Sequence, residues 1–113
     1  MKRYVMAFLK RGPVQIKDSL ERVNLQKAHL QNIERMADEG KLIVAGPFLD
    51  KEPVRGIYIF NVSTIEEAKA LTETDPAIQA GTLEMELRPW YGSAALIEVT
   101  AIHKKISKKS ISR

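Results

Sequence analysis

Cysteine is absent from this chain of 113 residues. Its absence excludes disulfide scaffolds, thiol catalysis, cysteine zinc sites and iron–sulfur clusters. Histidine occurs only twice, as His29 and His103, and two histidines do not complete a zinc site without carboxylates. We therefore expect neither a metal site nor a cofactor.

Long apolar runs are also missing, since none approaches the roughly 20 residues that span a membrane. The first residues are typical of a strand, and not of a basic region followed by the apolar core of a signal peptide. We therefore expect a cytoplasmic protein with no membrane partner.

Positive charge is concentrated at the end of the chain. The net charge is +4, but residues 1–98 carry −1, while residues 99–113 hold five Lys and Arg and no acidic residue. The near-neutral body shows no basic face for nucleic acid, so we expect no nucleic-acid partner. Binding of nucleic acid or an anionic surface by the basic tail is an alternative.

The remaining composition is that of a single globular domain, with 44% hydrophobic and 28% charged residues. The hydrophobic pattern predicts strands over residues 3–9, 42–48, 56–62 and 82–88, and helices over residues 19–39 and 64–72. The order β-α-β-β-α-β predicts a ferredoxin-like α+β fold, an antiparallel sheet with two helices on one face.

The first predicted helix has recognisable ends. Asp18 followed by Glu21 is typical of a capping box, and Gly40 is typical of a C-terminal stop. The apolar stripe of this helix, opposite its charged side, consists of Leu20, Val23, Leu30, Ile33 and Ala37.

The second face of the sheet needs a cover, because three strands are apolar on both faces and two helices cover only one. A second copy packed face to face would provide it, so we expect a homodimer or a higher homo-oligomer. The alternative is that the end of the chain folds back over this face. We assign residues 1–93 to the domain and residues 94–113 to an extension, which forms an extra strand followed by a basic flexible tail.

Two residues could form an acid–base pair. His29 lies near the apolar face of the first helix, where an imidazole can lie against the sheet and titrate near neutral pH. Asp75 precedes Pro76 at a turn. Each also has a simpler interpretation, His29 as a packed ring at the helix boundary and Asp75 as the N-cap of a helix that begins with proline.

Other candidates lie at strand ends. Gly46 and Pro47 interrupt a strand, and a glycine there often lets another group approach closely. Trp90 and Tyr91 follow the last strand and could wall an apolar pocket or an interface, or close the end of the fold. Three arginines could hold an anionic substrate or could be solvated: Arg3, Arg55 and Arg88.

Together these pieces resemble the YciI-like (YCII-related) family of the dimeric α/β-barrel superfamily over about residues 3–91. The matching pieces are Ala28-His29-Leu30, Glu39-Gly40-Lys41-Leu42, Ala45-Gly46-Pro47-Phe48, Glu66-Glu67-Ala68, Asp75-Pro76 and Ala80-Gly81. The resemblance implies a face-to-face dimeric barrel and a histidine–aspartate pair in a pocket beneath the sheet. Residue by residue, it makes His29 and Asp75 the catalytic candidates. The substrate-binding candidates are Gly46, Pro47, Trp90 and Tyr91.

The resemblance also implies a class of reaction. One branch of the family is similar to small lyases or dehydrochlorinases that act on hydroxylated, chlorinated rings. We therefore expect a cofactor-free enzyme whose His–Asp pair catalyses elimination, isomerisation or hydrolysis of a small cyclic or hydroxylated molecule. The alternative is a non-catalytic dimeric module that binds a small ligand or a protein.

Overall fold

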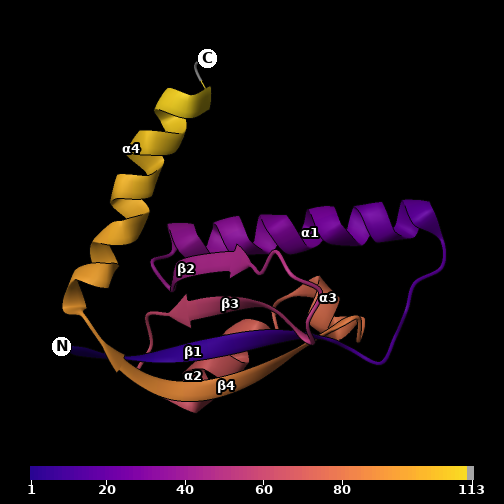
Figure 1. Cartoon of the computed structure of the whole chain (residues 1–113), viewed down its shortest axis with the longest axis horizontal. Coiled ribbons are helices and arrows are strands. Elements are labelled where there is room, and N and C mark those ends of the chain that lie inside the picture. Colours follow the sequence, from indigo (N-terminus) through magenta and orange to yellow (C-terminus); the bar gives the residue numbers. More distant parts are fainter. Residues whose placement is uncertain (112–113) are drawn as a thin grey trace.

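A four-stranded antiparallel sheet forms the centre of the chain, whose computed structural model describes residues 1–111 (Figure 1). The strands lie in the order β2-β3-β1-β4. Their bounds are Lys2–Arg11 (β1), Leu42–Pro47 (β2), Val54–Phe60 (β3) and Leu83–Gly92 (β4). The helical segments are Ser19–Asp38 (α1), Ile65–Thr72 (α2), Pro76–Gln79 (α3), Ala94–Glu98 (η1, a 3₁₀ helix) and Val99–Ile111 (α4). The predicted order of strands and long helices over residues 1–93 is confirmed, and the chain has an α+β fold of the ferredoxin-like type.

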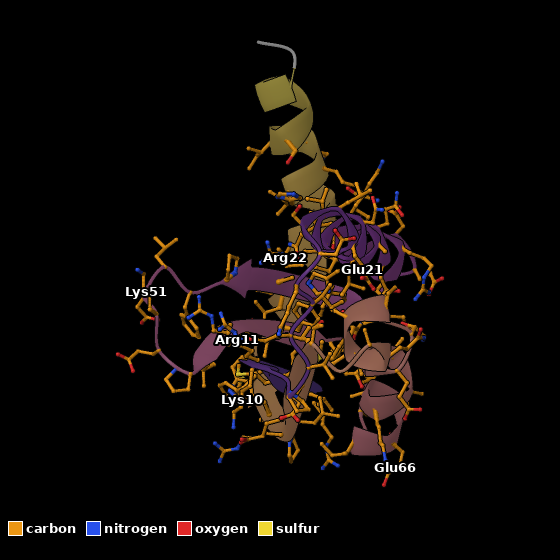
Figure 2. All side chains as sticks on the ribbon, turned by 90° about the vertical axis from the view of Figure 1, so that its right-hand side faces the viewer. Lys10, Arg11, Glu21, Arg22, Lys51 and Glu66 are labelled. Carbon is orange, nitrogen blue, oxygen red and sulfur yellow. The ribbon has the colours of Figure 1, made fainter. Side chains whose placement is uncertain are left out.

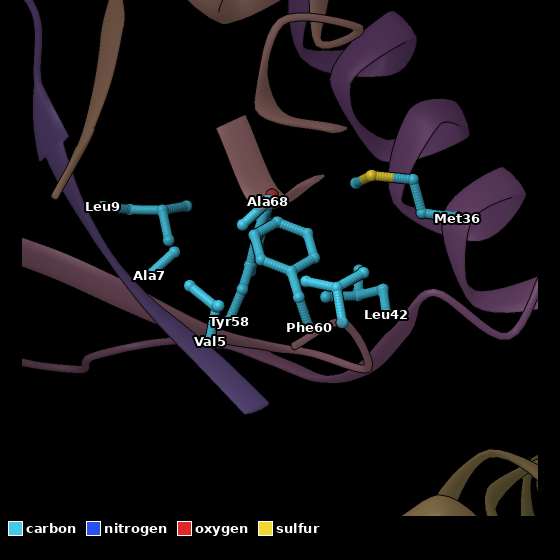
Figure 3. Packing of buried hydrophobic residues seen from close by; sticks show 9 residues of the cluster. Val5, Ala7, Leu9, Met36, Leu42, Tyr58, Phe60 and Ala68 are labelled. Carbon is cyan, nitrogen blue, oxygen red and sulfur yellow. The ribbon is translucent and has the colours of Figure 1, made fainter. Parts of the chain in front are cut away.

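The main core lies between the sheet and the helices α1 and α2. Alternate residues of the central strand β1, Val5, Ala7 and Leu9, point to this side and are buried. Met36 of α1 and Ala68 of α2 reach the same cluster from the helices (Figure 3). This alternation is what a strand with period two requires, and it places one row of β1 side chains beneath the helices.

Helix α1 turns only part of the predicted stripe to the sheet, since Ile33 packs against the main core and Ala37 is partly buried. Its buried positions are Asn32 and Met36, whereas Leu20, Val23 and Leu30 are exposed. The inward stripe is therefore rotated towards the side that carries polar residues. The polar Asn32 is accommodated there because it hydrogen-bonds the side chains of its neighbours Arg35 and Thr74.

The ends of α1 match the sequence only in part. Asp18 is the N-cap, but its side chain makes no capping hydrogen bond, so the predicted capping box is wrong. At the other end, Gly40 has a φ of +75° and donates its backbone N–H to the carbonyl of Ala37. A left-handed glycine of this kind is the expected stop.

The second face of the sheet is covered in part by the end of the chain. Tyr4, Ile43 and Ile59 form a small buried cluster, and Leu96 and Val99 pack against it. The fold-back alternative is therefore the one seen in the chain, and no second copy is needed for this part of the face.

The extension is helical and not an extra strand, so that prediction is wrong (Figure 1). The apolar residues Leu96, Val99, Ile102 and Ile106 recur at spacings of three and four, which is a helical period that the weak alternation of residues 94–103 obscured. The predicted flexible tail is helical as far as Ile111, and its last two residues lie outside the described part of the chain. No helix among the described residues is long and apolar enough to cross a membrane.

We expect Leu96 to contribute to stability and its neighbour Ile97 not to. Leu96→Ala removes contacts with the cluster around Tyr4 and should lower the free energy of unfolding by about 1–2 kcal/mol, less than for a fully buried leucine. Ile97 is 47% exposed, and Ile97→Ala should change it by less than about 0.5 kcal/mol. Urea denaturation of both variants tests this, and equal losses would contradict the described packing of η1.

Candidate functional site

The structure brings His29 and Asp75 together. His29 lies in the middle of α1, and Asp75 lies between α2 and α3, 46 residues later in the chain. Nδ1 of His29 is 2.7 Å from Oδ2 of Asp75. The aspartate side chain has no exposed surface, and that of the histidine is 13% exposed. A buried carboxylate is therefore paired with an imidazole that still reaches solvent.

The short helix α3 fixes the position of the aspartate. Asp75 is its N-cap, and Oδ1 accepts a hydrogen bond of 2.8 Å from the backbone N–H of Ala77. Pro76 follows at the first helical position, where its missing N–H costs nothing. The capping interpretation and the pairing interpretation therefore both hold, because each carboxylate oxygen serves one of them.

This geometry sets the tautomer of the histidine. An ionised carboxylate only accepts hydrogen bonds, so Nδ1 must carry the proton that is shared with Asp75. In the neutral ring, Nε2 is then an unprotonated acceptor. Nε2 is therefore the nitrogen that is left to act as a base.

Tyr58 of β3 is a third member of the site that the sequence did not reveal. Its hydroxyl lies 3.5 Å from Nε2 of His29, at the outer limit of a hydrogen bond. Burial raises the pKa of Tyr58 well above its usual range, and the negative charge of Asp75 raises it further. A buried tyrosine hydroxyl needs a hydrogen-bond partner, but no feature of the sequence shows that this partner is His29.

The raised pKa of Tyr58 has a consequence at alkaline pH. The unfolded chain loses the tyrosine proton near the ordinary value of about 10, while the fold retains it, so this contribution to stability is present below that pH and is lost above it. Above pH 10 the free energy of unfolding should fall faster in the wild type than in Tyr58→Phe, by up to about 1.4 kcal/mol per pH unit. Chemical denaturation at several pH values measures this. An equal fall of the free energy of unfolding with pH in the two proteins would contradict the prediction.

A cavity of about 730 Å³ opens beside His29. The segment of residues 14–17, the first half of α1, the start of α3 and the paired ends of β1 and β4 surround it. Its lining residues are Arg11, Val14, Gln15, Ile16, Lys17, Arg22, Leu25, Gln26, His29, Ala77, Thr82 and Leu83. Its size falls in the range of pockets for small organic molecules. Asp75 does not line it and lies behind His29.

Gly12 fixes the position of the segment of residues 14–17, which forms one wall of the cavity. The backbone N–H groups of Gly12 and Val14 donate to the carbonyls of Thr82 and Gly81, at 2.9 and 3.0 Å. A Cβ on Gly12 would lie only 2.1 Å from the carbonyl oxygen of Gly81. Only glycine permits this approach, which brings the segment of residues 14–17 against the start of β4.

The four predicted substrate-binding residues do not line this cavity. Gly46 and Pro47 lie at the end of the edge strand β2, which two strands separate from β4. Trp90 and Tyr91 lie at the opposite end of β4 from Leu83, and the Trp90 ring stacks near Tyr4 instead. Strand-end position alone did not show which end of the sheet would carry the cavity.

The glycines provide a matched test of this geometry. Gly12→Ala forces backbone atoms apart and should lower the free energy of unfolding by more than about 1 kcal/mol. Gly46→Ala meets nothing within 4 Å and should change it by less than about 0.5 kcal/mol. Thermal or urea denaturation compares the two, and a larger cost at Gly46 would be incompatible with the described close approach.

Among residues 1–111, no group of three or more histidine, aspartate and glutamate side chains could hold a metal ion. The polar side-chain groups of the site are an imidazole, a carboxylate and a phenol.

Comparison with known proteins identifies the family. The family model of the YCII-related domain matches residues 4–91. The uncharacterized protein YjpA of Bacillus subtilis is 29% identical over 62 residues, which are 55% of this chain and 71% of YjpA. Protein YciI of Escherichia coli is 33% identical over 76 residues, covering 59% of this chain and 78% of YciI.

A solved structure shares the fold. It is the 5-chloro-2-hydroxyhydroquinone dehydrochlorinase TftG of Burkholderia phenoliruptrix in complex with 2,5-dihydroxybenzoquinone. The TM-score is 0.57 at 18% identity, over 79% of this chain and 95% of TftG. The helix α4 lies beyond the residues that the family model matches. The fold and the family model agree with the resemblance in the sequence, and the chain belongs to the YCII-related family.

Proposed function

We propose that the chain is a small acid–base enzyme in which His29 removes a proton from a small cyclic or hydroxylated molecule. The observation that carries this proposal is the 2.7 Å contact between Nδ1 of His29 and the buried carboxylate of Asp75. A carboxylate in this position orients the imidazole and stabilises the charge that it acquires. His29 lines a cavity of suitable size and its side chain is 13% exposed, which supports binding of a substrate beside the ring.

The proposed reaction begins when Nε2 takes a proton from an acidic C–H or O–H group of the substrate. The electron pair of that bond stays on the substrate, and the ring becomes an imidazolium beside Asp75. In an elimination, this pair forms a double bond and expels a leaving group with its own bonding pair. In an isomerisation, the imidazolium returns the proton to a different atom. In a hydrolysis, Nε2 activates water instead.

Two further observations support the proposal. The raised pKa of Tyr58 keeps its hydroxyl neutral near Nε2, so it adds no second negative charge to the site. TftG, which has a similar fold, is named as a dehydrochlorinase of a hydroxylated, chlorinated ring. An elimination on a ring of this kind is the reaction that we favour for this chain.

We also propose that the chain forms a homodimer through the second face of its sheet. Leu96 and Val99 cover only the cluster around Tyr4. Met6, Phe8 and Ile57 remain partly exposed, and Phe8 and Ile57 point to the same side by the alternation of their strands. Light scattering of the purified chain should give twice the monomer mass of 12.8 kDa, and a monomer at all concentrations would refute this.

Exchange of substrate protons with solvent tests the proposed reaction. Small hydroxylated and cyclic compounds are incubated with the protein in deuterium oxide, and NMR follows incorporation of deuterium at carbon. Abstraction from a C–H group leaves this signature even where no net product forms, while reactions that begin at an O–H group or at water are followed by their products. We expect at least one compound to exchange faster with protein than without it. Compounds that bind in the cavity but never exchange or react would favour a non-catalytic binding module.

A further inference from the structure

The cavity beside His29 carries charge of one sign. Three of its lining residues are cations: Arg11, Lys17 and Arg22. No aspartate or glutamate belongs to the lining, although Asp18 and Glu21 are close to Lys17 and Arg22 in the chain. The rest of the lining is apolar or neutral, so the cavity combines an apolar wall with a cationic rim.

The three cations come from three different elements. Arg11 ends β1, Lys17 lies in the segment before α1, and Arg22 lies in the first turns of α1. Figure 2 faces this end of the molecule and shows Arg11 and Arg22 on it. Strand β1, the segment before α1 and helix α1 itself therefore each place one cation at the cavity beside His29.

In the described part of the chain, none of these three cations has a partner of opposite charge. The ion pairs of lysine and arginine in the described part of the chain use other residues, namely Lys10, Arg35 and Lys104. Within residues 1–111, Arg11, Lys17 and Arg22 form no ion pair. Like charges that face one opening without counter-charges raise the local concentration of anions.

The spacing along α1 connects this rim to the base. Arg22, Leu25, Gln26 and His29 share one face of the helix at spacings of three, four and seven residues. Seven residues at a rise of 1.5 Å put Arg22 and His29 about 10 Å apart along the axis. Helical side chains tilt towards the N-terminus, so the ring of His29 leans towards Arg22. A small cyclic compound with a charged substituent can therefore contact Arg22 and His29 at the same time.

We infer that the substrate is a small organic anion, a ring that carries a carboxylate or an acidic hydroxyl, and that Arg11, Lys17 and Arg22 hold its charged group. This inference rests on the proposed function, because it concerns the same cavity. It also has a chemical basis there. Removing a proton at His29 adds negative charge to the substrate, and fixed cations that face this charge lower the barrier. The apolar residues Val14, Ile16 and Leu25 would contact the body of the ring.

The test compares probes that differ only in charge. Salicylate is an anion, and salicylamide is a neutral molecule of nearly the same shape. Chemical shifts of the ¹⁵N-labelled chain give both affinities. We expect saturable binding of salicylate at residues of the cavity and binding of salicylamide that is at least fivefold weaker. Added salt should weaken the binding of salicylate and leave the binding of salicylamide unchanged, because salt screens exposed charges.

Charge-removing variants identify the cations. The affinity for salicylate should fall roughly three- to tenfold in each of three variants, Arg11→Gln, Lys17→Gln and Arg22→Gln. Each variant removes one charge-assisted contact at an exposed position. All three side chains are exposed, so the fold should be retained. The matched control is Lys27→Gln, an exposed lysine of α1 that does not line the cavity, and it should leave the affinity unchanged.

Three results would overturn the inference. The first is no saturable binding of salicylate, and the second is equal affinity for salicylate and salicylamide. The third is a loss of salicylate affinity in Lys27→Gln as large as in the three cavity variants. None of these measurements depends on proton transfer. The proposed function fails separately, if no compound that binds in the cavity exchanges or reacts, even where the three cations prove to hold the anion.

Discussion

Replacing His29 by asparagine is expected to lower the rate of proton abstraction roughly 10²–10⁴-fold, the usual contribution of one general base. The asparagine amide can occupy the position of Nδ1 and still donate to Asp75, while the atom that corresponds to Nε2 is missing. The hydrogen bond that fixes the aspartate is thus retained as the base is removed.

The measurement is deuterium incorporation into the most active compound of the exchange screen. His29→Gln is the complementary variant, because its amide does not reproduce the Nδ1 position and it also lacks the basic nitrogen. Both variants should be inactive and should lose the contact of Nε2 with the Tyr58 hydroxyl, and the asparagine variant should be the more stable of the two because it keeps the hydrogen bond to Asp75. Full activity of His29→Asn would remove the histidine from the mechanism.

Two variants of Asp75 should separate its two roles. Asp75→Asn keeps an oxygen that can accept from the N–H of Ala77, but its amide group donates towards Nδ1 and drives the ring to the other tautomer. We expect the exchange rate to fall roughly 10²–10⁴-fold while the free energy of unfolding changes by less than about 1 kcal/mol.

Asp75→Ala should in addition destabilise the fold. It removes the cap of α3 and leaves the donors of Ala77 and His29 without their acceptor, at a cost of about 2–4 kcal/mol. Urea denaturation and deuterium exchange of the substrate, measured on Asp75→Asn and Asp75→Ala, separate the capping role from the catalytic role. Equal stability losses in the two variants, with exchange preserved in Asp75→Asn, would make Asp75 a structural cap alone.

The sequence predicted the central pair but not its surroundings. His29 and Asp75 were candidates by residue type, but only the family resemblance paired them, since turn chemistry alone indicated an N-cap at Asp75. Tyr58 escaped because a tyrosine in an apolar strand is indistinguishable from ordinary core until the strand is paired with its neighbours. Its partner His29 is 29 residues away in the chain.

The walls of the cavity were beyond prediction for a related reason. The sequence offers Arg3, Arg55 and Arg88 as strand-end cations that could hold an anion or be solvated, whereas the cations that line the cavity are Arg11, Lys17 and Arg22. Their convergence depends on the hydrogen bonds that tie Gly12 and Val14 to residues 81–82, and these long-range contacts leave no periodic signal in the sequence.

The helical faces were misjudged where polar residues turn inwards. A stripe defined by hydrophobicity alone selected Leu20, Val23 and Leu30, which are exposed. The observed face instead carries His29 and Asn32, whose polar groups have partners in the fold. The inward face of α1 therefore combines apolar residues of the core, Met36 and Ile33, with polar residues that an apolar pattern alone does not select.

The most direct test of the account is the protonation of the two ring nitrogens of His29 in solution. Long-range ¹H–¹⁵N correlation spectra report which nitrogen carries the proton in the neutral ring. We expect a proton on Nδ1 in the wild type, an unprotonated Nε2, and a change to the Nε2-protonated form in Asp75→Asn. A wild-type ring protonated at Nε2, or one that does not respond to Asp75→Asn, would contradict the claim that Asp75 prepares Nε2 as the base.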